Sequence, residues 1–211
     1  MFPGLTSHLL TLRCWFFFPF MREVFLFGGL SASSRENIDH LLRRYKDGSP
    51  RPGKAVVLVV GGAVEALSAR PGSLSLVLTK RFGFVRKAIE HGVPLVPCFA
   101  FGENELYMQS VAPEGSFTRR FQDAFKRVFT VSTPMVRGRG VFNYSFGLLP
   151  KRHPVTVIVG APIETEGGPN ESPATEEIQR MHARYVEALT ELFEKNKLEH
   201  GLGETDHLEI T

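Results

Sequence analysis

Residues 55–62 read AVVLVVGG, an apolar and mostly β-branched run that ends in two glycines. The run predicts a buried strand over 55–60, because a strand covered on both faces shows no polar alternation. Gly61 and Gly62 would let backbone N–H groups approach a ligand closely, although paired glycines are also common in plain turns. Glu65 follows where an α/β sheet usually presents its ligands. It is therefore a candidate catalytic carboxylate, with capping of the following turn as the alternative.

Strands and helices alternate outward from this run. Three further apolar segments predict strands: 74–78, 95–101 and 154–159. Three segments predict helices: 37–42, 84–91 and a long helix from a cap at Thr175. Ser33 or Ser34 can cap the first helix, and Gly92 can end the second. The long helix carries an apolar stripe of Ile178, Met181, Tyr185, Leu189, Leu192 and Phe193. This order predicts an α/β fold with a central mixed, partly parallel sheet flanked by helices.

The composition is that of a globular protein, and the charge favours binding to a lipid surface or a phosphate over binding to a nucleic acid. Of the 211 residues, 43% are hydrophobic and 22% charged, so we expect one domain over 1–211, with a loose polar tail over 201–211. A net charge of +3 is too small to indicate nucleic-acid binding but suits an anionic membrane surface. Cys14 and Cys98 lie far apart, which argues against a metal site and a disulfide framework. No bound cofactor is expected.

Two segments are candidates for contact with a membrane surface. Leu9–Phe27 is rich in aromatic residues, but two arginines, a proline and a glutamate interrupt it, so it lacks the ~20 apolar residues of a spanning helix. A signal peptide is also a poor fit, because no basic start or cleavage site is present. We expect residues 1–30 to form an apolar, membrane-proximal segment, either buried or interfacial. A basic amphipathic helix predicted over 117–129 either packs on the sheet or rests on a membrane.

Two polar clusters could bind a substrate. Arg81, Arg86 and Lys87 lie around the start of the helix at 84–91 and could hold a phosphate or a carboxylate, or form a solvated basic face. Glu103 and Asn104 directly follow the strand at 95–101, where they either line a polar site or cap a turn.

Residues 81–104 read RFGFVRKAIEHGVPLVPCFAFGEN. This segment closely resembles the signature block of the type-2 diacylglycerol acyltransferase family, which also includes monoacylglycerol and wax-alcohol acyltransferases. Other segments fit in the same order, from Phe2-Pro3-Gly4, through GGAVEAL at 61–67, to VGAPI at 159–163. The resemblance therefore covers nearly the whole chain.

The resemblance implies transfer of a fatty acyl group from acyl-CoA to the hydroxyl of a mono- or diacylglycerol or a long-chain alcohol, in neutral-lipid synthesis. It implies a single domain of the glycerolipid-acyltransferase kind, on the cytosolic face of the endoplasmic reticulum membrane or on a lipid droplet. Acyl-CoA is then a co-substrate, and self-association of the chain stays open. The implied contacts are acceptor binding at Gly61, Gly62 and Glu65, CoA phosphates at Arg81, Arg86 and Lys87, and pocket lining by Glu103 and Asn104.

One departure from the family pattern affects the expected activity. The family's general base is a histidine in a His-Pro-His-Gly motif before the Phe-Pro-Gly segment, and this sequence begins at Met1-Phe2-Pro3-Gly4. His153-Pro154 matches a different family position and is no substitute. The family's N-terminal membrane hairpin is missing with the motif. We therefore expect a fragment, a truncated isoform or an incomplete gene model with little acyl transfer of its own. The alternative is an inactive relative that binds lipid or a family partner.

Overall fold

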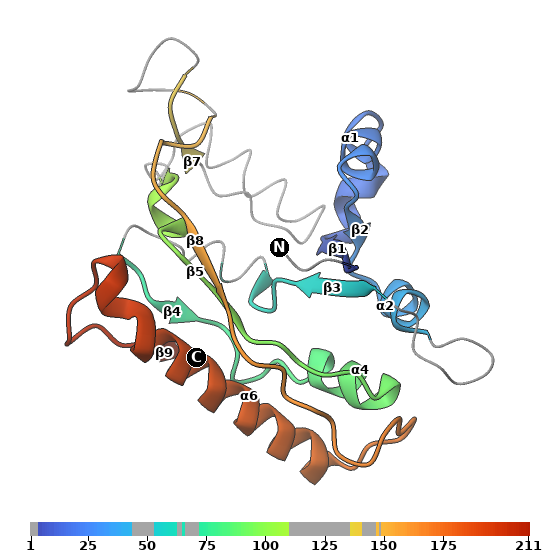
Figure 1. The fold of residues 1–211 in the computed structure, drawn as a ribbon. Coiled ribbons are helices and arrows are strands. Elements are labelled where there is room, and N and C mark those ends of the chain that lie inside the picture. The colour runs from blue at the N-terminus through green and yellow to red at the C-terminus, as the bar shows by residue number, and fades with distance from the viewer. Residues whose placement is uncertain are drawn as a thin grey trace, which may run out of the picture. The chain divides into compact units, whose positions relative to one another are not determined.

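A computed structural model describes residues 4–43, 53–62, 65, 72–109, 136–140, 147 and 149–211 (Figure 1). The chain divides into two compact units. The first comprises Met1–Val60, Arg81–Leu95 and Pro162–Arg184, and the second comprises Gly61–Lys80, Val96–Ala161 and Tyr185–Thr211. The amphipathic helix predicted over 117–129 lies outside the described residues.

A parallel three-stranded sheet forms much of the first unit. Its strand order is β2 (Ser31–Ala32), β1 (Thr6–Thr11) and β3 (Lys54–Leu58). Parallel neighbours need crossover connections. The crossover from β1 to β2 contains the 3-10 helix η1 (Arg13–Phe17) and α1 (Met21–Phe27), and that from β2 to β3 contains α2 (Arg35–Leu42). The predicted cap of α2 is confirmed, because the hydroxyl of Ser34 accepts a hydrogen bond from the N–H of Asn37 at 3.2 Å.

The core of the first unit lies between α4 (Gly83–His91) and the first part of α6 (Thr175–Asn196). Val85 and Ile89 of α4 are fully buried against Ile178 and Met181 of α6. As predicted, α4 ends at Gly92, which adopts the left-handed conformation with φ 58° and ψ 44°. The predicted long helix and its apolar stripe are confirmed, although α6 begins at Thr175 itself.

In its described residues, the second unit contains three two-stranded sheets. β5 (Cys98–Phe101) pairs antiparallel with β8 (Thr156–Val159), and β6 (Met108–Gln109) pairs antiparallel with β7 (Val136–Arg137). β4 (Ser75–Leu76) pairs parallel with β9 (Glu209–Ile210). It also contains the second part of α6 and the 3-10 helices η2 (Glu103–Glu105) and η3 (Lys197–His200). Phe101 stacks on Phe193 with ring centroids 5.7 Å apart, so the end of α6 packs against β5.

The expected α/β class, with mixed and partly parallel strands flanked by helices, is confirmed. In the described part of the chain, the strands form four small sheets where one central sheet was expected. The strands predicted over 55–60 and 154–159 are present but not buried, since Val57 is 44% and Val157 60% exposed. β3 is an edge strand, and β8 has one strand partner among the described residues. Their apolar side chains therefore have few neighbours.

The loose tail predicted over 201–211 is wrong for the last residues of the chain. Glu209–Ile210 form β9, and the carbonyl of Thr211 accepts hydrogen bonds from the N–H groups of Leu78 and Thr79, each at 2.9 Å. The polar composition of this segment concealed the pairing, because a strand at a sheet edge is held by its backbone rather than by apolar side chains.

Candidate functional site

The carboxylate of Glu65 is fixed by backbone on two sides. Its Oε2 accepts a hydrogen bond from the N–H of Val77 at 3.1 Å. It also packs directly over Gly61, where any Cβ would overlap the Glu65 side chain. Gly62 has φ 61°, a left-handed conformation that glycine adopts at little cost. Gly61 therefore creates the space in which Glu65 lies against Val77, while Gly62 provides the left-handed turn that follows the strand.

The surroundings of Glu65 disfavour its charge. Burial raises the pKa of this half-buried carboxyl, the Val77 N–H acts in the opposite direction, and the negative charge of Glu103 adds to the rise. Among the described residues, no group forms a hydrogen bond with the second oxygen, Oε1. Glu65 thus has one oxygen held by the backbone and one that can meet a hydroxyl group.

Glu103 and Asn104 lie in η2, directly after β5. Gly102 caps η2 with φ 84°, and a Cβ there would collide with the carbonyl of Pro154. The side-chain amide of Asn104 donates to the carbonyl of Ser73 at 2.8 Å, and the Glu103 side chain is exposed. Asn104 therefore contacts the same short segment, 73–78, that holds Glu65.

One residue that interacts with Glu65, Tyr185, was not predicted as a site residue. Tyr185 of α6 is buried, and burial raises its pKa to about 12, with the charges of Cys98 and Glu65 acting in the same direction. Burial also raises the pKa of the Cys98 thiol. The sequence placed Tyr185 in the apolar stripe of the long helix. Its hydroxyl, the one polar group in that stripe, was the signal that could have assigned it to the site.

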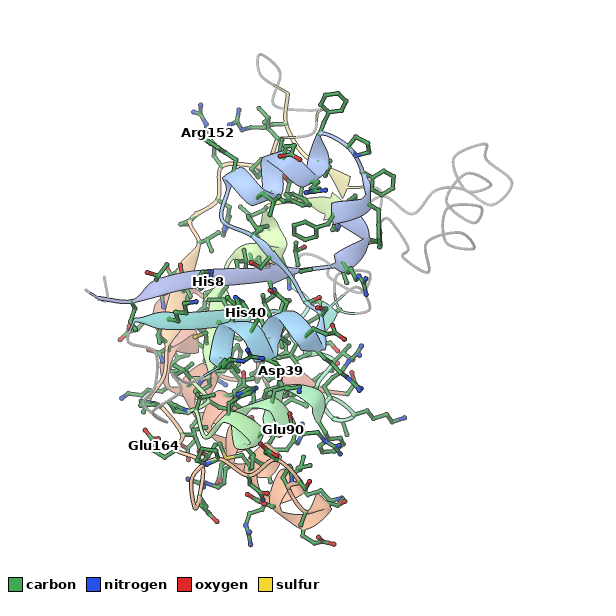
Figure 2. All side chains as sticks on the ribbon, turned by 90° about the vertical axis from the view of Figure 1, so that its right-hand side faces the viewer. His8, Asp39, His40, Glu90, Arg152 and Glu164 are labelled. Carbon is green, nitrogen blue, oxygen red and sulfur yellow. The ribbon has the colours of Figure 1, made fainter. Side chains whose placement is uncertain are left out.

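The predicted basic cluster of Arg81, Arg86 and Lys87 lies in the first unit, and its members differ in whether their charge is paired. Lys87 forms ion pairs with Asp39 of α2 and with Glu90 of its own helix, each at 2.7 Å. Figure 2 labels these two carboxylates, on α2 and α4. Arg81 and Arg86 are exposed, and neither forms an ion pair or a side-chain hydrogen bond within the described part of the chain. The positive charge of Lys87 is therefore already matched, whereas both arginines can receive an anion.

The segment around η1 and α1 has a packed inner face and an exposed outer face. Trp15 and Phe16 pack on Phe25, with ring centroids 6.3 and 6.1 Å apart. On the outer side, four apolar residues are more than 60% exposed, and we call them the aromatic surface: Phe17, Phe20, Val24 and Phe27. Phe20 has φ 67°, which is unusual for a residue other than glycine. The segment is thus partly buried and partly exposed.

No helix in the described ranges is long and apolar enough to cross a membrane. Nor do three or more potential metal-ligating side chains gather anywhere among these residues.

Comparison with known proteins identifies the family. The family model for diacylglycerol acyltransferase matches residues 1–211. The chain belongs to the diacylglycerol acyltransferase family. It is 42% identical to diacylglycerol O-acyltransferase 2 of Dictyostelium discoideum over 208 residues, which is 99% of this chain and 61% of that protein. The expected family membership is thereby confirmed.

Other members of this acyltransferase family are similar to the same degree. The chain is 42% identical to human acyl-CoA wax alcohol acyltransferase 2 over 209 residues, 61% of that protein, and 40% identical to mouse 2-acylglycerol O-acyltransferase 1 over 208 residues, 60% of that protein. Each match covers 99% of this chain. The chain thus spans about 60% of the length of these relatives. No solved structure matches it.

The family uses acyl-CoA as a co-substrate and makes neutral lipids. The structure brings five of the predicted site residues into the second unit: Gly61, Gly62, Glu65, Glu103 and Asn104. The remaining three, Arg81, Arg86 and Lys87, lie in the first unit.

Proposed function

We propose that this chain contributes the acceptor-binding site of an enzyme that transfers a fatty acyl group from acyl-CoA to the hydroxyl of a mono- or diacylglycerol or a long-chain alcohol. The acceptors named for its relatives are an acylglycerol in two cases and a wax alcohol in the third. The observation that carries the proposal is the geometry of the Glu65 carboxylate: Gly61 and Val77 hold it in place through Oε2, and Oε1 has no hydrogen-bond partner among the described residues.

In the proposed reaction, the acceptor hydroxyl attacks the thioester carbonyl of acyl-CoA. The C–O bond of the ester forms, the C–S bond breaks, and the hydroxyl proton ends on the CoA thiol. We assign Glu65 to orienting the acceptor, because its Oε1 can accept the hydrogen bond of a hydroxyl while Oε2 stays on Val77. The resemblance assigns proton removal to a histidine in a His-Pro-His-Gly motif, which the printed sequence does not contain.

Asn104 and Glu103 have different parts in this proposal. Asn104 holds segment 73–78 through the Ser73 carbonyl, so it supports the backbone that binds Glu65. Exposed Glu103 can hydrogen-bond a second polar group of the acceptor, such as another glycerol oxygen. An acceptor with a single hydroxyl would then depend on Glu65 more than on Glu103.

Arg81 and Arg86 are proposed to bind the phosphates of acyl-CoA. Both are exposed and unpaired in the described part of the chain, and a guanidinium group can bind phosphate oxygens in pairs. Lys87 was predicted together with them. Its ion pairs with Asp39 and Glu90 make it a support of α4, so we expect its contribution to phosphate binding to be smaller.

The aromatic surface is proposed to enter a lipid surface. Phe20 is 85% and Phe27 98% exposed, and arginines at 13 and 22 lie beside them in the sequence, exposed to bind anionic headgroups. Long-chain acceptors dissolve in membranes, so a site that uses them has to meet a membrane. We propose the cytosolic face of the endoplasmic reticulum or a lipid droplet. Glycan on the Asn170 sequon in cells would contradict this side of the membrane.

The test of the reaction is an acyl-transfer assay with labelled acyl-CoA. The chain is joined to the part of the Dictyostelium relative that it does not match, and is supplied with diacylglycerol, monoacylglycerol or a long-chain alcohol in vesicles. Labelled ester from at least one acceptor is expected. If the fusion binds acyl-CoA but forms no ester with any acceptor, the chain is an inactive relative that binds lipid or a partner, and the proposed reaction is wrong.

A further inference from the structure

Segment 73–78, which contains β4, is hydrogen-bonded along both edges, and the two edges serve different partners. Alternate residues of a strand direct their backbone groups to opposite edges. On one edge, the carbonyl of Leu74 accepts from the N–H of Glu209 at 3.0 Å, and the carbonyl of Leu76 accepts from the N–H of Thr211 at 2.9 Å. The N–H of Leu78 donates to Thr211 on the same edge at 2.9 Å.

The other edge of segment 73–78 carries the candidate site. The carbonyl of Ser73 accepts from the side chain of Asn104 at 2.8 Å, and the N–H of Val77 donates to Glu65 at 3.1 Å. The backbone groups of Leu74, Leu76 and Leu78 therefore bind the C-terminal strand, whereas those of Ser73 and Val77 bind the two proposed site residues. A shift of the segment on one edge necessarily moves the groups on the other.

A buried lysine fixes the turn that precedes the C-terminal strand β9, which pairs with β4. Lys197 is only 5% exposed, and its ammonium group donates to the carbonyls of Glu204 and Asp206, each at 2.8 Å. It also forms an ion pair with Glu194 at 2.7 Å. A buried charge requires such partners, so the turn over 203–206 is fixed to the end of α6. Residues 209–211 follow directly from that turn.

We infer that residues 209–211 form a positioning element for the Glu65 and Asn104 site. β4 has two residues, and a two-stranded ribbon of this length is marginal without support on both edges. Without β9, Val77 and Ser73 lose the restraint that keeps them in reach of the two site side chains. The expected effect of this element on catalysis rests on the proposed function. Its effect on the position of Glu65 does not, because that position can be measured without acyl transfer.

The experiment is an NMR titration of the unmodified chain and of variants, with the Val77 amide as the probe. In the wild-type chain, the Val77 amide shift should change with pH as Glu65 ionises, and Glu65→Gln should abolish that change. Deletion of 209–211, and Thr211→Pro, which removes the N–H that donates to Leu76, should reduce the pH-dependent change at least twofold. Glu209→Ala keeps the backbone and should leave the titration as in the wild type.

The direction in which the midpoint of the Glu65 titration shifts provides an independent readout. The Val77 N–H favours the carboxylate form of Glu65, so its loss should move the Glu65 titration to higher pH. Unchanged resonances of Val85 and Ile89 show that the first unit is still folded in each variant. If deletion leaves both the amplitude and the midpoint at wild-type values, the positioning role is refuted. If it changes both while Glu65→Gln keeps full acyl transfer, the positioning stands and the role proposed for Glu65 falls.

A second variant covers the case in which the deletion unfolds the second unit. Lys197→Met keeps residues 209–211 but removes the ammonium group that fixes the turn before them. It should produce the same upward shift of the Glu65 midpoint, with a smaller loss of amplitude. A wild-type titration in Lys197→Met, with the Leu78 amide still protected from exchange, would show that the strand reaches β4 without this anchor and would overturn that step.

Discussion

The Nζ atom of Lys87 lies 2.7 Å from Oδ1 of Asp39, which links α4 to α2 in the first unit. His91, in the last turn of α4, lies 2.8 Å from the same oxygen. Burial alone would raise the pKa of Asp39, but the hydrogen bonds from His91 and Lys87 outweigh it and hold the pKa below its ordinary 3.8. Asp39, Lys87 and His91 therefore form a structural link between α2 and α4. For this reason, phosphate binding is assigned to Arg81 and Arg86.

Asp39→Asn should destabilise the chain by about 0.5–1 kcal/mol at pH 7, a small value because the Asp39 side chain is partly exposed. A lowered folded-state pKa gives stability that is complete above the unfolded pKa and is lost as pH falls through the folded one. The difference between wild type and variant should therefore shrink below pH 3.8. Urea denaturation at pH 7 and at pH 3 measures it. Glu187→Gln is the control and should change nothing, because Glu187 is exposed and forms no ion pair among the described residues. A pH-independent difference for Asp39→Asn would rule out this link.

Gly61→Ala should disrupt the candidate site itself. The added Cβ overlaps both the carboxylate and the Cβ of Glu65, so rotation of the carboxylate cannot relieve the contact. We expect a loss of about 1–3 kcal/mol in unfolding free energy and a clear fall in acyl transfer by the fusion protein. Gly83→Ala is the matched control, because nothing lies within 4 Å of its added Cβ and it begins a helix. Equal stability of the two variants would contradict the packing of Glu65 on Gly61.

Phe20→Ser and Phe27→Ser should weaken binding to phospholipid vesicles. Burial of one phenylalanine contributes about 1.5–3 kcal/mol, so each substitution should reduce vesicle binding about tenfold or more. Both side chains are exposed, so the melting temperature should hardly change. Sedimentation with anionic vesicles measures the binding. Leu198→Ser removes an equally apolar exposed side chain from η3 and should bind as the wild type does. Wild-type binding by both phenylalanine variants would reject the aromatic surface as the lipid contact.

Local chemistry made several elements predictable from the sequence. The Ser34 cap, the left-handed Gly92 and the stripe of α6 each depend on residues within a few positions of one another. Such features follow from propensity and spacing, which is why they agree with the structure.

Long-range pairing could not be predicted in this way. β9 meets β4 from more than 130 positions away, and Asn104 meets Ser73 through its side chain. The exposure of Val57 depends on which strands flank it, and the state of Lys87 depends on a carboxylate in another helix. Composition describes a residue but not its partners. The polar tail over 201–211 was therefore predicted to be loose, and Arg81, Arg86 and Lys87 were predicted to share one role.

If Glu65 orients the acceptor hydroxyl, Glu65→Gln in the fusion protein should slow acyl transfer without unfolding the chain. Glutamine keeps an oxygen that can accept the Val77 N–H but removes the carboxylate charge, so the fold should persist. Glu191→Gln, on the exposed side of α6, is the control. The measurement is the rate of ester formation at saturating acyl-CoA over a range of diacylglycerol concentrations. We expect kcat/KM for diacylglycerol to fall at least tenfold in Glu65→Gln and to stay at the wild-type value in Glu191→Gln. A Glu65→Gln enzyme that folds and forms ester at the wild-type rate would contradict the account.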